Sequence, residues 1–162
     1  MKELLLCAFM CMALTVSSKV LEFKGIPIDG DYKDFISQIE KKGLKLDTHS
    51  YDKNQCIAVF DTSNEGDEYK VLVQWNAVTG KVYSVGTMIC VVYVDTELLD
   101  AIDSLCNSVK GQYKILDYEI DENETHTYTV IDGTQQILIW AEDGMPVINM
   151  INLNNAPSES YD

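Results

Sequence analysis

The feature that most constrains the fold is a long, nearly uncharged run from Lys81 to Val94, which leads directly into an amphipathic stretch from Asp95 to Gly111. The run is rich in β-branched and aromatic residues. Such a composition predicts one long strand buried on much of both faces, or two strands joined at Gly86. The pattern that follows the run resembles the pattern that precedes it, so we interpret the run as the junction between two similar halves.

The first half begins with a short extended segment and a helix. Residues 20–28 alternate between apolar and polar, and Pro27 restricts them to an edge strand or an extended lead-in. Asp31 is a suitable cap for a helix over residues 32–42, and Gly43 is a suitable stop. Further strands are expected over residues 44–51, 55–61 and 69–75.

The turn Ala77–Gly80 predicts how the strand over residues 69–75 pairs with the long run. With Val78 and Thr79 as the loop pair, Trp75 lies opposite Val82, Val73 opposite Ser84 and Val71 opposite Gly86. If Trp75 and Val82 face the helices, the opposite face is unusually apolar for a solvent face. A ligand, a partner or a second copy could cover it, or the halves or loops could pack there. The candidate binding residues on this face are Leu72, Gln74, Tyr83 and Val85.

The second half starts with a helix that Asp95 would cap and Gly111 would end. Its apolar stripe consists of Leu98, Leu99, Ile102, Leu105 and Val109. Four strands are then expected over residues 113–120, 125–131, 135–141 and 145–153, and residues 154–162 form a polar, flexible tail.

The predicted order, a helix and four strands occurring twice, indicates an internal duplication. Gly43 and Gly111, Trp75 and Trp140, and Gly80 and Gly144 recur at similar separations. The expected fold class is α+β, with one α-β unit over residues 19–94 and a second over 95–153. Each unit would pack a helix on an antiparallel sheet, and the two sheets could be continuous and curved. The alternative is a single α+β sheet with two unrelated helices.

The first 18 residues predict a secretory signal peptide. A charged start precedes an unbroken apolar core, and Val16 and Ser18 suit cleavage before Lys19. The core is too short to span a membrane, and a buried N-terminal helix is the alternative. We therefore expect an extracytoplasmic protein, periplasmic or secreted, without a membrane segment after cleavage. Three cysteines remain after cleavage: Cys56, Cys90 and Cys106. We expect all three to be small buried hydrophobic residues, and the alternative is that two of them form one disulfide.

Charge narrows the class of partner. The formal net charge is −14, from 26 acidic residues against 12 lysines, and the chain has no arginine. Nucleic acids and anionic membrane surfaces are therefore unsuitable partners, because both are bound through clustered basic residues. A protein or an envelope component remains as the expected partner.

Few residues suggest chemistry. If Asp52 and Lys53 form a two-residue loop, His49 lies opposite Cys56, where a thiolate and imidazole could act as a nucleophile pair or metal half-site. A packing pair is the favoured interpretation, since no third orienting group is evident. His126 is expected to be a half-exposed strand residue.

The acidic segments suggest cation binding only weakly. Residues 61–67 carry oxygen ligands and a glycine, but Leu72 stands where an EF-hand needs its bidentate glutamate. Residues 117–123 lack the glycine. Asp29, Asp31 and Asp34 fit helix initiation better than acid–base catalysis. Asn123 begins a glycosylation sequon, relevant only in a glycosylating host. No metal, cofactor or catalytic residue is predicted.

Two resemblances add to this interpretation. The segment Leu21–Gly30, with Phe35 on a short helix and Lys42-Gly43 after it, resembles the opening of an uncharacterised family of small secreted bacterial proteins. The stretch Lys81–Val85 followed by a leucine-rich helix fits that family too. The element order is similar to that of the beta-lactamase inhibitor protein fold, which implies two helix-and-four-strand units in one curved sheet but assigns no inhibitory residue here.

The function expected from these features is a non-catalytic binding or inhibitor-like module. A structural or self-associating envelope protein is the second hypothesis. An enzyme that uses His49 and Cys56 is the third.

Overall fold

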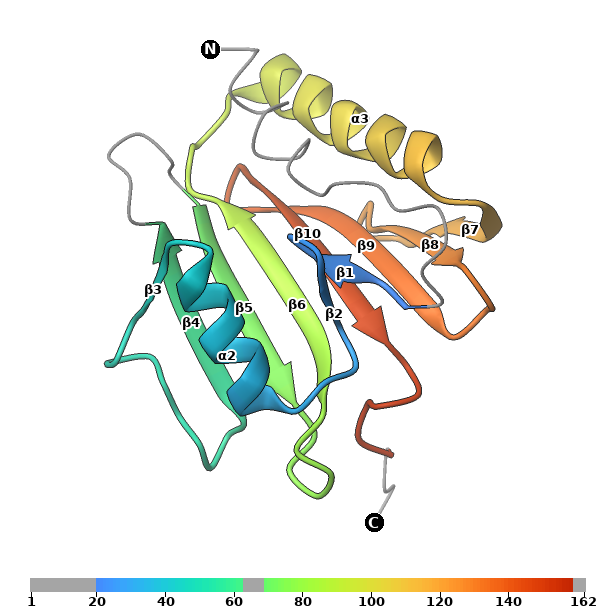
Figure 1. The fold of residues 1–162 in the computed structure, drawn as a ribbon. Helices are drawn as coiled ribbons and strands as arrows, with labels where there is room; N and C mark the ends of the chain where they lie inside the picture. The colour runs from blue at the N-terminus through green and yellow to red at the C-terminus, as the bar shows by residue number, and fades with distance from the viewer. Residues whose placement is uncertain (1–19, 63–68, 159–162) are drawn as a thin grey trace.

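The computed structural model describes residues 20–62 and 69–158, and within them it is a mixed α+β fold (Figure 1). Two helices accompany an eight-stranded antiparallel sheet and a separate two-stranded sheet. The helices are α2 (Tyr32–Lys41) and α3 (Asp95–Gln112), and the small sheet pairs β1 (Glu22–Phe23) with β2 (Ile26–Pro27). The large sheet contains β3 (Leu44–Leu46), β4 (Ile57–Thr62), β5 (Tyr69–Trp75), β6 (Val82–Ile89), β7 (Ile115–Ile120), β8 (His126–Val130), β9 (Gln135–Glu142) and β10 (Met145–Asn152).

The order of strands across the large sheet is β3-β4-β5-β6-β10-β9-β8-β7. The last strand of each half, β6 and β10, therefore pair at the centre, and the first strand of each half lies at an edge. All the pairings in the described large sheet are antiparallel. Short turns require this of the consecutive strands that they join, whereas β6 and β10 are distant in the chain.

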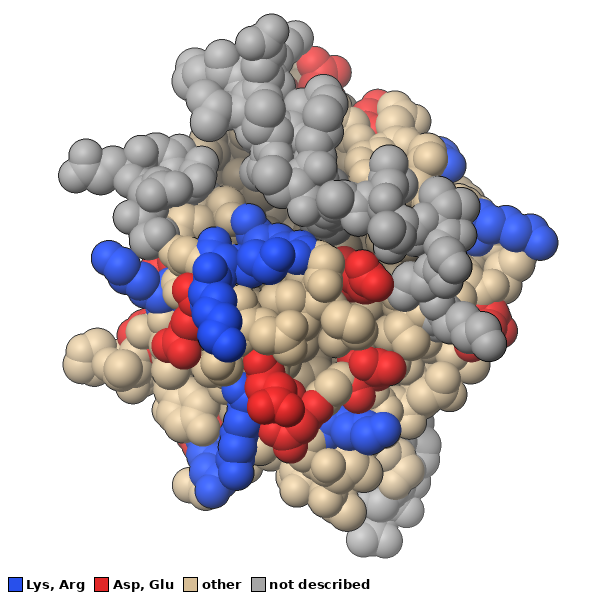
Figure 2. All heavy atoms as spheres, in the orientation of Figure 1, with Lys and Arg blue, Asp and Glu red and all other residues tan. Residues whose placement is uncertain are grey.

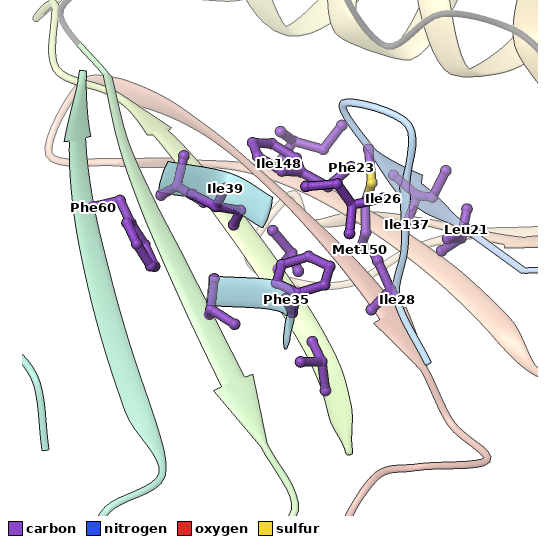
Figure 3. Packing of buried hydrophobic residues seen from close by; sticks show 14 of the residues in the cluster. Leu21, Phe23, Ile26, Ile28, Phe35, Ile39, Phe60, Ile137, Ile148 and Met150 are labelled. Carbon is purple, nitrogen blue, oxygen red and sulfur yellow. The ribbon is translucent and has the colours of Figure 1, made fainter. Parts of the chain in front are cut away.

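The segment over residues 20–28 forms a small hairpin of its own, whereas the sequence predicted an edge strand or an extended lead-in. Lys24 and Gly25 both have positive φ, at 51° and 76°, which is the geometry of a tight two-residue hairpin turn. Four apolar side chains of this segment are buried in the core: Leu21, Phe23, Ile26 and Ile28 (Figure 3). The hairpin thus packs on the large sheet and is not one of its edges.

Helix α2 forms as predicted. The side chain of Asp31 caps it by accepting a hydrogen bond from the Lys33 N–H at 2.9 Å. Gly43, at φ +91°, lies directly after its last turn, in a conformation that favours glycine. Phe35 and Ile39, one turn apart, point into the core (Figure 3).

The run from Lys81 to Val94 forms a shorter strand than predicted. β6 ends at Ile89, and the Tyr93 N–H then bonds to the carbonyl of Gly144 at 3.0 Å, outside the ladder. Helix α3 begins at Asp95 with Val94 as its cap, so Asp95 does not cap it. It ends at Gln112, one residue beyond the predicted stop at Gly111. The four strands predicted after it are confirmed, with small differences at their ends.

The predicted pairing of β5 with β6 is right at one end only. Trp75 lies opposite Val82 as predicted, but the register then shifts, so that Val73 faces Val85 and Leu72 faces Gly86. Tyr83 is the extra residue, a β-bulge in β6. The predicted pairs Val73–Ser84 and Val71–Gly86 are wrong, because a turn-based register assumes an uninterrupted ladder.

One face of the sheet carries the core. Residues directly opposite each other in a ladder point to the same face, so a row of paired residues marks that face across the sheet. One such row is no more than 2% exposed, and it consists of Ala58, Val73, Val85, Met150, Ile137 and Tyr128. Both helices and the β1–β2 hairpin contribute to the same buried cluster, which places them on this side of the sheet (Figures 1 and 3).

Candidate binding surface

The four candidate binding residues do not share one face. Leu72 and Gln74 alternate with the buried Val71 and Val73, so they point away from the helices. Val85 is only 1% exposed and pairs with Val73 in the core row. Its assignment to the binding surface was wrong, because the bulge reverses the facing of every β6 residue beyond it.

The face turned away from the helices, here called the open face, is defined by two further rows of paired residues. These rows are Val59, Leu72, Gly86, Asn149, Leu138, Thr127 and Glu119, and Ile57, Gln74, Ser84, Ile151, Gln136, Thr129 and Asp117. All but Ser84 are partly or fully exposed. Since both helices pack on the other face, this face is open to solvent.

A polar group marks the middle of the open face. The Ser84 hydroxyl donates a hydrogen bond to the Asn149 side-chain oxygen at 2.9 Å. Gly86 lies beside this pair, and a Cβ added to it would meet the Asn149 oxygen at 3.5 Å and the Leu72 Cβ at 3.8 Å. Gly86 thus lies between the Asn149 and Leu72 side chains, and a Cβ there would be at ordinary van der Waals distance from both. Sequence reasoning missed Asn149, although a polar residue with apolar neighbours on both sides in a strand was a visible signal.

Tyr83 lies at the bulge, on the half of the sheet that carries Leu72 and Gln74. Partial burial raises the pKa of its phenol, and the nearby Cys56 thiol adds to the effect. Its hydroxyl therefore stays protonated at neutral pH and is available as a hydrogen-bond donor. Leu72 and Gln74 together offer an apolar and a hydrogen-bonding side chain on the open face, a composition that suits protein recognition.

The structure separates His49 from Cys56, which the sequence placed opposite each other. β3 ends at Leu46, and Asp47 then redirects the chain by accepting hydrogen bonds from the His49 N–H at 2.9 Å and the Ser50 hydroxyl at 2.6 Å. These bonds hold the pKa of Asp47 below its usual value. The Cys56 thiol contacts the Lys53 carbonyl at 3.7 Å instead. The hairpin register that paired His49 with Cys56 was therefore wrong.

The other candidate residues have structural partners. His126 is a partly buried strand residue, as predicted, and its Nδ1 lies 2.8 Å from the Tyr118 hydroxyl. Asp121 accepts the backbone N–H groups of Asn123 and Thr125, which lowers its pKa and closes the β7–β8 turn. Most of the acidic segment 61–67 lies outside the described residues. In the part of the chain that is described, no group of three or more His, Cys, Asp or Glu side chains is placed to hold a metal ion.

A buried polar cluster lies between α3 and the second half of the sheet. Burial raises the pKa of the Cys106 thiol and, more strongly, that of the Tyr128 phenol. Among the described residues, the Tyr128 hydroxyl is the buried side-chain group without a well-formed hydrogen bond, although the Cys106 thiol interacts with it electrostatically. The raised pKa values favour the neutral form of both groups, and a neutral thiol is a weaker nucleophile than a thiolate.

Comparisons with protein-family models, with curated proteins and with solved structures found no match. The fold itself gives the class of the protein: within the described residues it is a mixed α+β protein with an eight-stranded antiparallel sheet. None of the helices in residues 20–62 and 69–158 is long and apolar enough to cross a membrane.

Proposed function

We propose that this chain is a non-catalytic binding or inhibitor-like module that acts outside the cytoplasm on a protein or an envelope component. The observation that supports this most is the open face, a broad sheet surface with partly exposed apolar side chains such as Leu72, Leu138 and Ile151 beside hydrogen-bonding groups such as Gln74 and Asn149. A preformed sheet presents such a surface with little backbone-ordering cost on binding. The helix side carries groups of lysine and acidic side chains (Figure 2).

The proposed architecture behind this surface is a tandem of two α-β units. The strand order supports it, since the two halves of the sheet mirror each other about the β6–β10 pair. The match between Trp75 and Trp140 does not support the tandem. Trp75 is buried in the core, whereas Trp140 is half-buried and lies on the open face. The proposed relation to the beta-lactamase inhibitor protein fold rests on the same element order.

The proposed extracytoplasmic location rests on the leader, residues 1–18, which lies outside the described residues. Residues Cys56, Cys90 and Cys106 are unpaired in the structure. A chain with a core of this size does not need a disulfide in an oxidising compartment.

The open face can be tested with two matched double variants. Leu72→Lys with Leu138→Lys places two charges on the open face, whereas Val78→Lys with Leu99→Lys adds the same charges at exposed positions in a turn and on α3. Wild type and the second variant should capture the same partner from envelope and secreted fractions, and the first variant should lose it. The captured partner is then purified and titrated against all three proteins.

The alternatives give different results. If the first variant binds as well as wild type does, the open face is not the binding surface. If nothing is captured and the mass in solution rises with protein concentration, a self-associating envelope protein is the better hypothesis. A Cys56→Ala variant that abolishes a measured activity would support the Cys/His enzyme, for which the separation of His49 from Cys56 offers no structural support.

A further inference from the structure

The two edges of the large sheet differ in how they are protected. β3, at one edge, is three residues long and contacts α2. β7, at the other edge, is six residues long and pairs with β8 along one side. Short or covered edges discourage pairing with another chain, and long exposed ones permit it. The β7 edge is therefore the side of the sheet at which a further strand can be added.

The backbone of β7 is oriented for such pairing. The Tyr118 N–H donates to the side chain of Asp117 at 2.9 Å, so this amide points away from β8. In an antiparallel ladder the N–H and C=O of one residue point to the same side and the direction alternates along the strand. The N–H and C=O groups of Tyr118 and Ile120 therefore face away from β8. In the free protein, the Asp117 carboxylate accepts the hydrogen bond of the Tyr118 N–H.

The side chains of β7 define what can bind there. On the open face, β7 carries two acidic side chains, Asp117 and Glu119, and each ends one of the two rows that define that face. Tyr118 and Ile120 lie on the other face and are 40% and 54% exposed. The Lys110 ammonium lies 5.5 Å from the centre of the Tyr118 ring, so that face already carries a positive charge.

A second copy of this chain fits the edge poorly. Two copies joined by a two-fold axis through a continuous antiparallel sheet must keep like faces together. Asp117 and Glu119 of one copy would then lie opposite the same acidic residues of the other. Like charges directly opposite each other destabilise a ladder, and the net charge of −14 on each copy adds repulsion.

We propose that β7 binds an extended segment of a cationic partner protein as a ninth, antiparallel strand. The segment has Lys or Arg at two alternate positions, beside Asp117 and Glu119, and an apolar residue between them, beside Tyr118. Main-chain hydrogen bonds supply affinity and the alternating side chains supply specificity, as in other cases of strand addition. The Asp117 carboxylate releases the Tyr118 N–H to the incoming strand and pairs with its basic residue. This site lies at the rim of the open face, where Asp117 and Glu119 end its two rows, and it does not require a partner at the centre of that face.

The test uses the full chain and blocked, fluorescently labelled peptides of alternating lysine and valine, measured by anisotropy at low and moderate salt. The valines lie opposite Tyr118, so N-methylation of the valines removes the hydrogen bonds to β7, whereas N-methylation of the lysines leaves them. We expect the lysine-methylated peptide to bind like the parent and the valine-methylated peptide to lose binding. Hydrogen exchange at the Tyr118 and Ile120 amides should slow when the parent peptide binds.

Charge variants separate this site from general attraction to an acidic protein. Asp117→Lys with Glu119→Lys should weaken the lysine–valine peptide about tenfold or more, and should bind a glutamate–valine peptide in its place. The control, Glu40→Lys with Asp100→Lys, makes the same net change at exposed positions on α2 and α3 and should bind like wild type. Circular dichroism checks that both variants fold.

Three results would overturn the proposal. They are no binding of the lysine–valine peptide at low salt, equal binding of the two methylated peptides, and equal weakening by the two charge variants. A dimer in sedimentation that Asp117→Asn with Glu119→Gln strengthens, by removing the repulsion between the acidic residues of the two copies, would replace the cationic partner with a second copy.

Discussion

At the scale of single residues, buried polar groups hold the N-terminal hairpin on the sheet. The Asn152 side chain donates to the Ile28 carbonyl at 2.9 Å and accepts from Gln135 at 3.3 Å. The Leu21 N–H in turn donates to Gln135 at 3.4 Å. Gln135 and Asn152 are among the few buried polar residues of the structure.

Asn152→Ala should therefore lower the free energy of unfolding by roughly 1–3 kcal/mol, because it leaves the Ile28 carbonyl buried without its side-chain donor and removes one of the two acceptors of the Gln135 amide. Urea denaturation measures the change. Asn123→Ala, at an exposed position in the β7–β8 turn, is the control and should change stability little. Equal effects of the two substitutions would contradict this account of the hairpin.

The three cysteines of the described residues should differ in reactivity. Cys90 is partly exposed, whereas Cys56 and Cys106 are buried and burial raises the pKa of the Cys106 thiol. Because the thiolate is the reactive form and must be accessible, iodoacetamide should modify Cys90 first in the native protein. Peptide mass spectrometry identifies the site. Modification of Cys106 before Cys90 would show that α3 opens readily.

At the scale of elements, the segment that joins β6 to α3 is held by the turn between β9 and β10. Gly144 has φ +77°, and a Cβ there would lie 3.3 Å from both the Tyr93 carbonyl oxygen and the Val92 side chain. Gly133 has a similar φ of +88°, but a Cβ there would meet nothing within 4 Å. The two glycines thus share the backbone requirement and differ in crowding.

Gly133→Ala should cost roughly 1–3 kcal/mol from backbone strain alone, and Gly144→Ala should cost more because the segment before α3 must also shift. Thermal unfolding of both variants gives the comparison. If Gly144→Ala costs no more than Gly133→Ala, the contact of the turn with Val92 and Tyr93 contributes nothing to stability.

At the scale of the whole molecule, one buried cluster joins the two halves. It includes Phe35 and Ile39 from α2, Leu105 and Val109 from α3, and strands from both halves of the sheet. The β6–β10 ladder connects the halves through the backbone as well. We therefore expect the two halves to unfold together, even though the tandem proposal treats them as repeats.

Tryptophan fluorescence can test this, because Trp75 lies in the first half and Trp140 in the second. The variants Trp140→Phe and Trp75→Phe each keep one tryptophan. In each variant, the urea midpoint measured by fluorescence should equal the midpoint of the same variant measured by circular dichroism. Phe35→Ala should lower both transitions equally, by roughly 3–5 kcal/mol. Separate transitions, with only the first-half probe affected, would show two independent units.

The sequence by itself determined the local elements. Asp31 and Gly43 mark the ends of α2 through a side-chain cap and a glycine conformation, and the apolar stripe of α3 follows helical spacing. The turns at Gly133 and Gly144 separate the last strands correctly. These signals act between residues a few positions apart, so they can be read without knowing what packs where.

Only the tertiary structure decided which side chains reach the open face. Because Tyr83 is an extra residue in β6, Val85 faces the core and not the open face. The turn at Asp47 ends the pairing of β3 before His49, so His49 does not lie opposite Cys56. The pairing of β6 with β10 and the exposure of β7 also depend on contacts between distant parts of the chain. Bulges, strand order and edges follow from the packing of the whole sheet, and the short-range pattern that specifies each strand carries no information about them.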